Sequence, residues 1–148
     1  MAKERRPAVD GWFTTDPAGI RLIGTRCTAC RTPYFPRNDL ACRNPACTGP
    51  RDGSELVECR LGDRGRVWSY AGARYQPPPP YVPVTDPFRP YAIAAVELAD
   101  ERMVVLGQVV PEAGVDDLAV GMEMELTVGT LYEDDEAEYL IWKWRPRG

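Results

Sequence analysis

Apolar and polar residues alternate along most of the second half of the chain. Such runs, rich in β-branched and aromatic residues, predict half-buried strands, and turn-forming residues separate them. Six runs have this pattern: Glu55–Leu61, Gly65–Tyr75, Tyr91–Leu98, Met103–Val110, Met122–Tyr132 and Ala137–Trp144. The only helix-like piece among them is short, at Val115–Ala119. We therefore predict a mainly β fold with a five- or six-stranded barrel of the oligonucleotide/oligosaccharide-binding (OB) type, a small open sandwich being the alternative.

The first part of the chain has a different character. Up to about Thr25, apolar residues are interrupted by proline and glycine, which predicts an extended arm. Residues 27–53 are rich in Pro, Arg, Asn and Gly and poor in branched aliphatics, so they cannot form a stable core without a cross-link such as a bound metal ion. We expect an arm over residues 1–25, a zinc ribbon over 26–54 and the barrel over 55–148. Trp12 and Phe13 of the arm are expected to pack on their own chain, with a partner surface as the alternative.

Four cysteines can supply such a cross-link. Cys27 and Cys30 lie on one tight turn, and Cys42 and Cys47 form a second pair. Four thiolates at this spacing suit one tetrahedral Zn²⁺ in a structural site, which leaves no position for a catalytic water. Iron, or a site that has lost its metal, is the alternative. Arg31 stands where the turn often needs a positive φ, which costs a non-glycine residue about 1 to 2 kcal/mol.

The sequence offers no catalytic set. It has no histidine, which excludes histidine bases and histidine-containing zinc sites. Carboxylate pairs such as Asp116–Asp117 suit solvated turns, and neither a nucleophile with a nearby base nor a glycine-rich phosphate loop is evident. Cys59, in the middle of a predicted strand, suits a small buried apolar residue rather than a fifth ligand. We expect no catalytic residues in this chain.

Charge further limits the partners. Residues 1–60 hold ten Lys and Arg against seven Asp and Glu, a net of +3, and residues 61–148 hold eight against fifteen, a net of −7. A barrel of that charge repels a phosphate backbone, so we expect no nucleic-acid partner, although zinc ribbons and OB barrels both occur in nucleic-acid-binding modules. A charged N-terminus and the lack of about 18 consecutive apolar residues predict no secretion signal, no membrane partner and a cytoplasmic location.

Two further features are a proline-rich loop and two pairs of aromatic residues. Residues 76–90 contain four consecutive prolines at Pro77–Pro80, which predict a stiff, extended loop, either functional or a rigid spacer. Trp142 and Trp144 lie two apart on the last strand and share a face, as do Trp68 and Tyr70 on an earlier one. Burial in the core is the favoured interpretation of both pairs over stacking on nucleic-acid bases.

The whole pattern resembles a bacterial and archaeal family that joins a rubredoxin-like zinc ribbon to an OB-fold and works beside acyl-CoA enzymes of the thiolase superfamily. The matching segments occur in order along nearly the whole chain: Leu22–Cys30, Tyr34–Arg37, Cys42–Cys47, Gly65–Tyr70, Pro90–Leu98 and Val105–Val109. The proline loop and the ending Tyr139–Trp144 are similar to members that accompany the thiolase-fold aldolases of steroid side-chain degradation.

The resemblance implies an accessory subunit that binds acyl-CoA and stabilises a thiolase-fold partner of the lipid-transfer-protein type. The partner would then catalyse retro-aldol cleavage of a β-hydroxyacyl-CoA. The resemblance also leaves open a second role, that of a subunit that channels acyl-CoA between a thiolase and a condensing or hydratase enzyme. In the implied role, Arg37 holds CoA phosphates or the partner. The loop residues expected to line the shared acyl path are Tyr75, Tyr81, Phe88 and Arg89.

Overall fold

Each of the six predicted runs forms a strand in the computed structural model, which describes residues 3–16, 19–83 and 87–147. The strands are β1 (Glu4–Pro7), β2 (Ile23–Cys27), β3 (Pro33–Tyr34), β4 (Leu56–Arg60), β5 (Arg64–Ala73), β6 (Tyr91–Leu98), β7 (Val104–Val109), β8 (Glu123–Glu133) and β9 (Ala137–Pro146). The predicted helical turn is a short 3-10 helix, η1 (Val115–Asp117).

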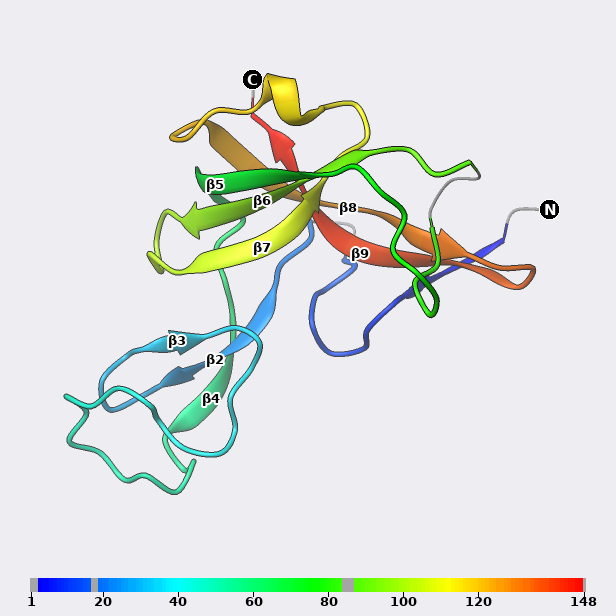
Figure 1. Ribbon diagram of the computed structural model, residues 1–148. Helices are drawn as coiled ribbons and strands as arrows, with labels where there is room; N and C mark the ends of the chain where they lie inside the picture. The colour runs from blue at the N-terminus through cyan, green and yellow to red at the C-terminus, as the bar shows by residue number, and fades with distance from the viewer. Residues whose placement is uncertain (1–2, 17–18, 84–86, 148) are drawn as a thin grey trace.

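Five strands close into a barrel (Figure 1). They pair in the order β5, β6, β7, β9 and β8, and β8 returns to pair with β5. The β7–β9 contact is parallel and the others are antiparallel. This closure removes the exposed sheet edges that a small open sandwich would leave. The predicted OB-type barrel is confirmed.

A sixth strand extends the barrel sheet, and the sequence pattern does not reveal it. Strand β1 pairs in parallel with β9, with Glu4 opposite Ala137 and Pro7 opposite Leu140. Its sequence, Glu-Arg-Arg-Pro, has no alternation of apolar and polar residues, so periodicity predicts only an extended arm. The arm therefore contributes an edge strand to the barrel sheet.

The ribbon has its own three-stranded sheet, in which β2 lies between β3 and β4 (Figure 1). Strand β4 pairs with β2 from Ile23 opposite Arg60 to Cys27 opposite Leu56. Its residues fall within the range 55–148 expected for the barrel, because periodicity predicts a strand but not its partner. The three expected ranges stay a prediction, with β4 joined to the ribbon by its hydrogen bonds.

An aromatic cluster joins the arm, the ribbon and the barrel. Trp12 stacks on Trp142 with ring centroids 5.9 Å apart and planes 14° apart. Phe35, which follows β3, meets both rings edge-on at 5.7 and 5.4 Å. Phe13 is buried in the barrel core with Trp144, which is completely buried. The expectation that the arm's aromatic residues pack on their own chain is confirmed.

We expect Trp12→Ala to lower the free energy of unfolding by about 3 kcal/mol, because it removes the ring that stacks on Trp142 and meets Phe35 edge-on. Denaturant unfolding measures the change. Trp68→Ala is the matched control, since Trp68 is 63% exposed and its loss should stay within about 0.5 kcal/mol. Equal losses from the two variants would mean that the cluster does not hold the arm and ribbon to the barrel.

The core interpretation of Trp68 and Tyr70 is wrong. Both are exposed, and the inward residue of this strand is Val67. The pairing of β5 with β6 shifts register between Val67 and Ser69, which is a β-bulge at Trp68. A bulge breaks the period of two on which the sequence argument depends. Trp68 itself lies on the outer surface because its neighbour Val67 points inward, and the bulge shifts the alternation of the residues that follow, such as Tyr70.

Candidate functional site

The four predicted cysteines come together at the tip of the ribbon. Their sulfur atoms all lie within 4.8 Å of one another, and three of the four residues are buried. Cys27 Sγ is 3.8 Å from Cys47 Sγ, and Cys30 Sγ is 3.5 Å from Cys42 Sγ. Four sulfurs at about 2.3 Å from a tetrahedral ion lie about 3.8 Å apart, so this cluster has the dimensions of a four-thiolate metal site. Cys59 is separate from it, partly buried on β4 against the barrel core.

Local backbone geometry holds the first pair of cysteines. The amide of Arg31 donates to the carbonyl oxygen of Cys27 at 2.6 Å, which closes the turn. Arg31 has a φ of 69°, so the left-handed backbone expected at this position is present. A non-glycine residue carries that conformation at a cost of about 1 to 2 kcal/mol. A strong constraint such as a bound ion can offset this cost.

Hydrogen bonds to the sulfurs favour thiolates. The hydroxyl of Tyr34 lies 3.3 Å from Cys42 Sγ and accepts from the amide of Arg43 at 2.7 Å. This hydroxyl lowers the pKa of Cys42, and the hydrogen bond from Thr32 lowers the pKa of Cys30 to about 6. Such contacts around metal ligands orient them and tune their basicity. At Cys47 the hydrogen bond from the Gly49 amide is outweighed by burial and the neighbouring cysteines, which raise its pKa to about 11, so the fourth thiolate needs the charge of a bound cation.

Arg51 supports the second pair of cysteines, and sequence reasoning missed it. Its guanidinium donates to the carbonyl oxygens of Cys42 at 2.7 Å, Asn44 at 2.9 Å and Cys47 at 2.9 Å. Three bonds from one planar fork fix the loop between the ligands. An arginine in a polar loop carries no sequence signal of this role, because its partners are backbone carbonyls.

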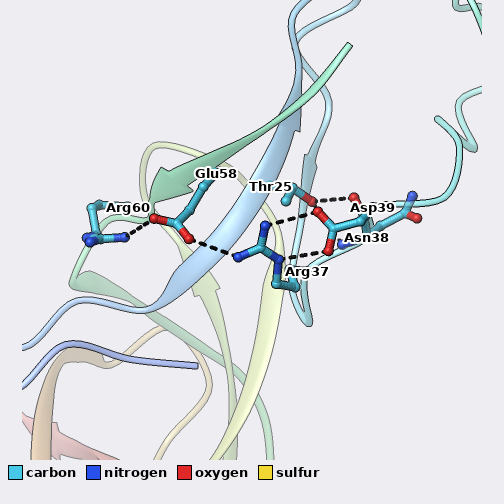
Figure 2. A network of polar contacts seen from close by, with 6 residues as sticks. All are labelled: Thr25, Arg37, Asn38, Asp39, Glu58 and Arg60. Carbon is cyan, nitrogen blue, oxygen red and sulfur yellow. Dashed lines mark hydrogen bonds and ion pairs between the residues drawn. The ribbon is translucent and has the colours of Figure 1, made fainter. Parts of the chain in front are cut away.

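Arg37, expected to face a substrate or partner, lies in a polar network beside the ribbon sheet (Figure 2). Its guanidinium donates to Asp39 at 2.8 and 3.0 Å and to Glu58 on β4 at 2.9 Å. The hydrogen bond from Arg37 lowers the pKa of both carboxyls. Next to it, the Thr25 hydroxyl donates to the carbonyl oxygen of Asn38 at 2.8 Å and accepts from the Asn38 amide at 2.9 Å. The loop that follows β3 is thereby tied to both β2 and β4.

Three of the four expected loop residues line a pocket beneath the proline loop, here called the loop pocket. Tyr81, Phe88 and Arg89 form part of its wall, and its volume is about 180 Å³. Burial, followed by a hydrogen bond with Tyr91, raises the pKa of Tyr81 to about 12. Tyr75 lies outside this pocket and is 87% exposed. No strand interrupts residues 76–83 and 87–90, and residues 84–86 of the expected loop lie outside the described part.

One further expectation concerns membranes. In residues 3–16, 19–83 and 87–147, no helix has the length and apolar character needed to cross a bilayer.

Comparisons with known proteins agree with this architecture. Residues 17–52 match the family model of the ChsH2 rubredoxin-like zinc ribbon domain, and residues 58–129 match that of the ChsH2 C-terminal OB-fold domain. A DUF35 domain-containing scaffold protein of Methanocaldococcus jannaschii is 31% identical over 124 residues, which cover 84% of this chain and 79% of the relative.

A solved structure, an Ltp2-ChsH2(DUF35) aldolase, superimposes with a TM-score of 0.64 at 27% identity. The match covers 95% of this chain and 98% of that one. Two domain models are thus matched in the same order as the ribbon and barrel, and a relative is similar across most of its length. The chain belongs to the ChsH2/DUF35 family of proteins that join a rubredoxin-like zinc ribbon to an OB-fold domain.

Proposed function

We propose that this chain is the accessory subunit of an aldolase complex and that its partner catalyses the carbon–carbon cleavage. The observation that carries the proposal is the similarity, over 95% of this chain, to a chain of an Ltp2-ChsH2(DUF35) aldolase. The Methanocaldococcus relative is named a scaffold protein, which supports a role in assembly. In the finer form of the proposal, the partner is a thiolase-fold enzyme of the cytoplasm that cleaves a carbon–carbon bond of a β-hydroxyacyl-CoA derived from a steroid side chain.

We further propose that the ion of the four-cysteine site is zinc, one per chain, with a structural role. Four thiolates form a closed shell around zinc, so no ligand position is left for chemistry. The ion would hold the loops of residues 27–53, which contribute only a small apolar cluster around the cysteines. In this proposal the ribbon is a rigid element that the metal keeps folded.

The surface that we assign to the partner is the outer face of β5, β6 and β7, here called the sheet patch and defined as Trp68, Ile93 and Leu106. The register places Ser69, next to Trp68, opposite Ala95, and Ala95 opposite Leu106. Trp68 and Leu106 are 63% and 64% exposed. Neighbouring exposed apolar side chains of this size are typical of protein–protein contacts, in which tryptophan is enriched.

The acyl-CoA role belongs to the same proposal. Tyr75, Tyr81, Phe88 and Arg89 would form the loop surface that an acyl-CoA passes at the contact between the subunits. Because Arg37 is already paired with two carboxylates, we propose that it faces the partner rather than the phosphates of CoA. Channelling of acyl-CoA to a second enzyme uses the same surface and is the alternative.

The test is purification of the tagged chain from its native cells, followed by mass spectrometry and an assay of retro-aldol cleavage of β-hydroxyacyl-CoA. We expect a thiolase-superfamily protein in stoichiometric amount, cleavage by the complex and none by the isolated chain. Cleavage by the isolated chain would contradict the accessory role. Recovery of nucleic acid that dissociates with salt, in place of an enzyme, would favour a nucleic-acid-binding module.

A further inference from the structure

The loop pocket is lined by two basic side chains, Arg89 of the proline loop and the buried Lys143 of β9. Its walls are largely aromatic and proline side chains from the proline loop, β6 and the segment after β7. Its floor includes Gln108 of β7 and Lys143 of β9, which are opposite each other in the parallel pairing. In Figure 1 the green loop between β5 and β6 descends in front of β9. Loops at this position in OB folds commonly contact ligands.

Lys143 is only 4% exposed, although lysine is almost never fully buried without a partner. The barrel makes room for its side chain. A Cβ atom at Gly129 of β8 would lie 2.9 Å from Lys143 Cδ and 3.0 Å from Cε, so the lysine stem packs against a position without a side chain. The absence of a side chain at Gly129 therefore lets β8 and β9 accommodate the buried Lys143 side chain.

The charge of this lysine is not balanced within the described residues. No described carboxylate lies within ion-pair distance of its ammonium group, and among the described acidic residues only the field of Glu112 opposes the effect of burial. Burial lowers the pKa of Lys143. The other titratable side chains that line the pocket are Tyr81, Tyr91 and Arg89, and none of them is a carboxylate.

We propose that the loop pocket binds a small carboxylate with an apolar or aromatic body, and that Lys143 holds the carboxylate group. A singly charged carboxylate matches one buried ammonium, and the aromatic walls match an apolar body. A cavity of 150 Å³ holds benzene, so about 180 Å³ admits a ligand of roughly six to nine non-hydrogen atoms. That size excludes CoA and a steroid acyl group from the cavity itself, although Tyr81, Phe88 and Arg89 border both the cavity and the proposed acyl-CoA surface.

Calorimetric titration of the full chain with benzoate and with benzamide tests the proposal. The two probes have the same shape, and only benzoate carries a charge. We expect benzoate to bind at least tenfold more tightly than benzamide to the wild-type chain. In Lys143→Met, which removes the ammonium group but keeps an unbranched apolar side chain of nearly the same length, we expect benzoate affinity to fall at least tenfold and benzamide affinity to change little.

Equal affinity for the two probes, absence of benzoate binding at millimolar concentration, or unchanged benzoate affinity in Lys143→Met would each overturn the proposal. A readout that needs no variant uses the fact that the chain has only two lysines, Lys3 and Lys143. After labelling with ¹³C-lysine, benzoate should shift the ε-CH₂ signal of Lys143 and leave that of Lys3 in place. A shift of neither signal, or of both equally, would also count against the site.

The effect of Lys143→Met on thermal stability distinguishes a binding role of Lys143 from a structural one. Because burial lowers the pKa of Lys143 in the folded state, protonation disfavours folding, and this penalty is present below the folded pKa and is relieved as pH rises through it. Lys143→Met should therefore raise the Tm at neutral pH, whereas Lys3→Met should not. A lower Tm for Lys143→Met, together with unchanged benzoate binding, would make Lys143 a structural residue.

Discussion

Replacing Cys42 with serine is expected to release the metal ion and unfold the ribbon while the barrel stays folded. Binding of a structural zinc contributes about 10 to 16 kcal/mol to folding at neutral pH, which equals or exceeds the stability of a typical domain. The ribbon's apolar cluster consists of the cysteines with Tyr34 and Leu56, so little else can hold it. The barrel has a separate core around Trp144 and Met124.

Metal analysis and amide hydrogen exchange measure this result. The wild-type chain should contain one zinc, and Cys42→Ser should contain well under one. Amides of residues 27–53 should lose protection, while those of β6 and β7 keep theirs. Cys59→Ser is the matched control, because Cys59 is a free thiol outside the four-cysteine cluster. Full zinc content and full protection in Cys42→Ser would contradict a structural four-thiolate site, as would zinc loss in Cys59→Ser.

The metal site was predictable because all its ligands lie within one short stretch of sequence. Cys27 and Cys30 share a turn, and their spacing alone predicts that both sulfurs point to one ion. The supporting contacts of Tyr34 and Arg51 were not predictable in the same way. They depend on where the loop places backbone carbonyls and a hydroxyl group, and a pattern of residue types does not encode these positions.

The barrel strands were predictable for a similar reason, since alternation is a local property. What alternation cannot give is the partner of a strand, so β4 was placed with the barrel although it pairs with β2. It also cannot say which of two faces is buried when both carry apolar residues, and the interpretation of Trp68 as a core residue was therefore wrong, because Val67 points inward instead. Lys143 is the converse case: it stands between two tryptophans on the face opposite to theirs, and a loop distant in sequence covers it.

The exposed Trp68 and Leu106 of the sheet patch are expected to contribute strongly to the affinity of the chain for its partner. If the sheet patch is the surface that meets the aldolase subunit, a buried carboxylate there has no partner and must lose its hydration. We expect Trp68→Glu and Leu106→Glu each to weaken the complex by about 30-fold or more, since central apolar contacts commonly contribute at least about 2 kcal/mol. Binding to the purified partner, by calorimetry or surface plasmon resonance, measures the loss.

Leu40→Glu is the matched control for Leu106→Glu, because the substitution is identical and Leu40 is 80% exposed against 64% for Leu106. All three side chains are exposed, so each variant should keep the thermal stability of the wild type within about 0.5 kcal/mol. A complex weakened by both sheet-patch variants and unaffected by Leu40→Glu places the partner on the outer face of β5–β7. If Leu40→Glu weakens the complex as much as Leu106→Glu does, the assignment of this surface is wrong, while the aldolase assay still decides whether the chain is an accessory subunit.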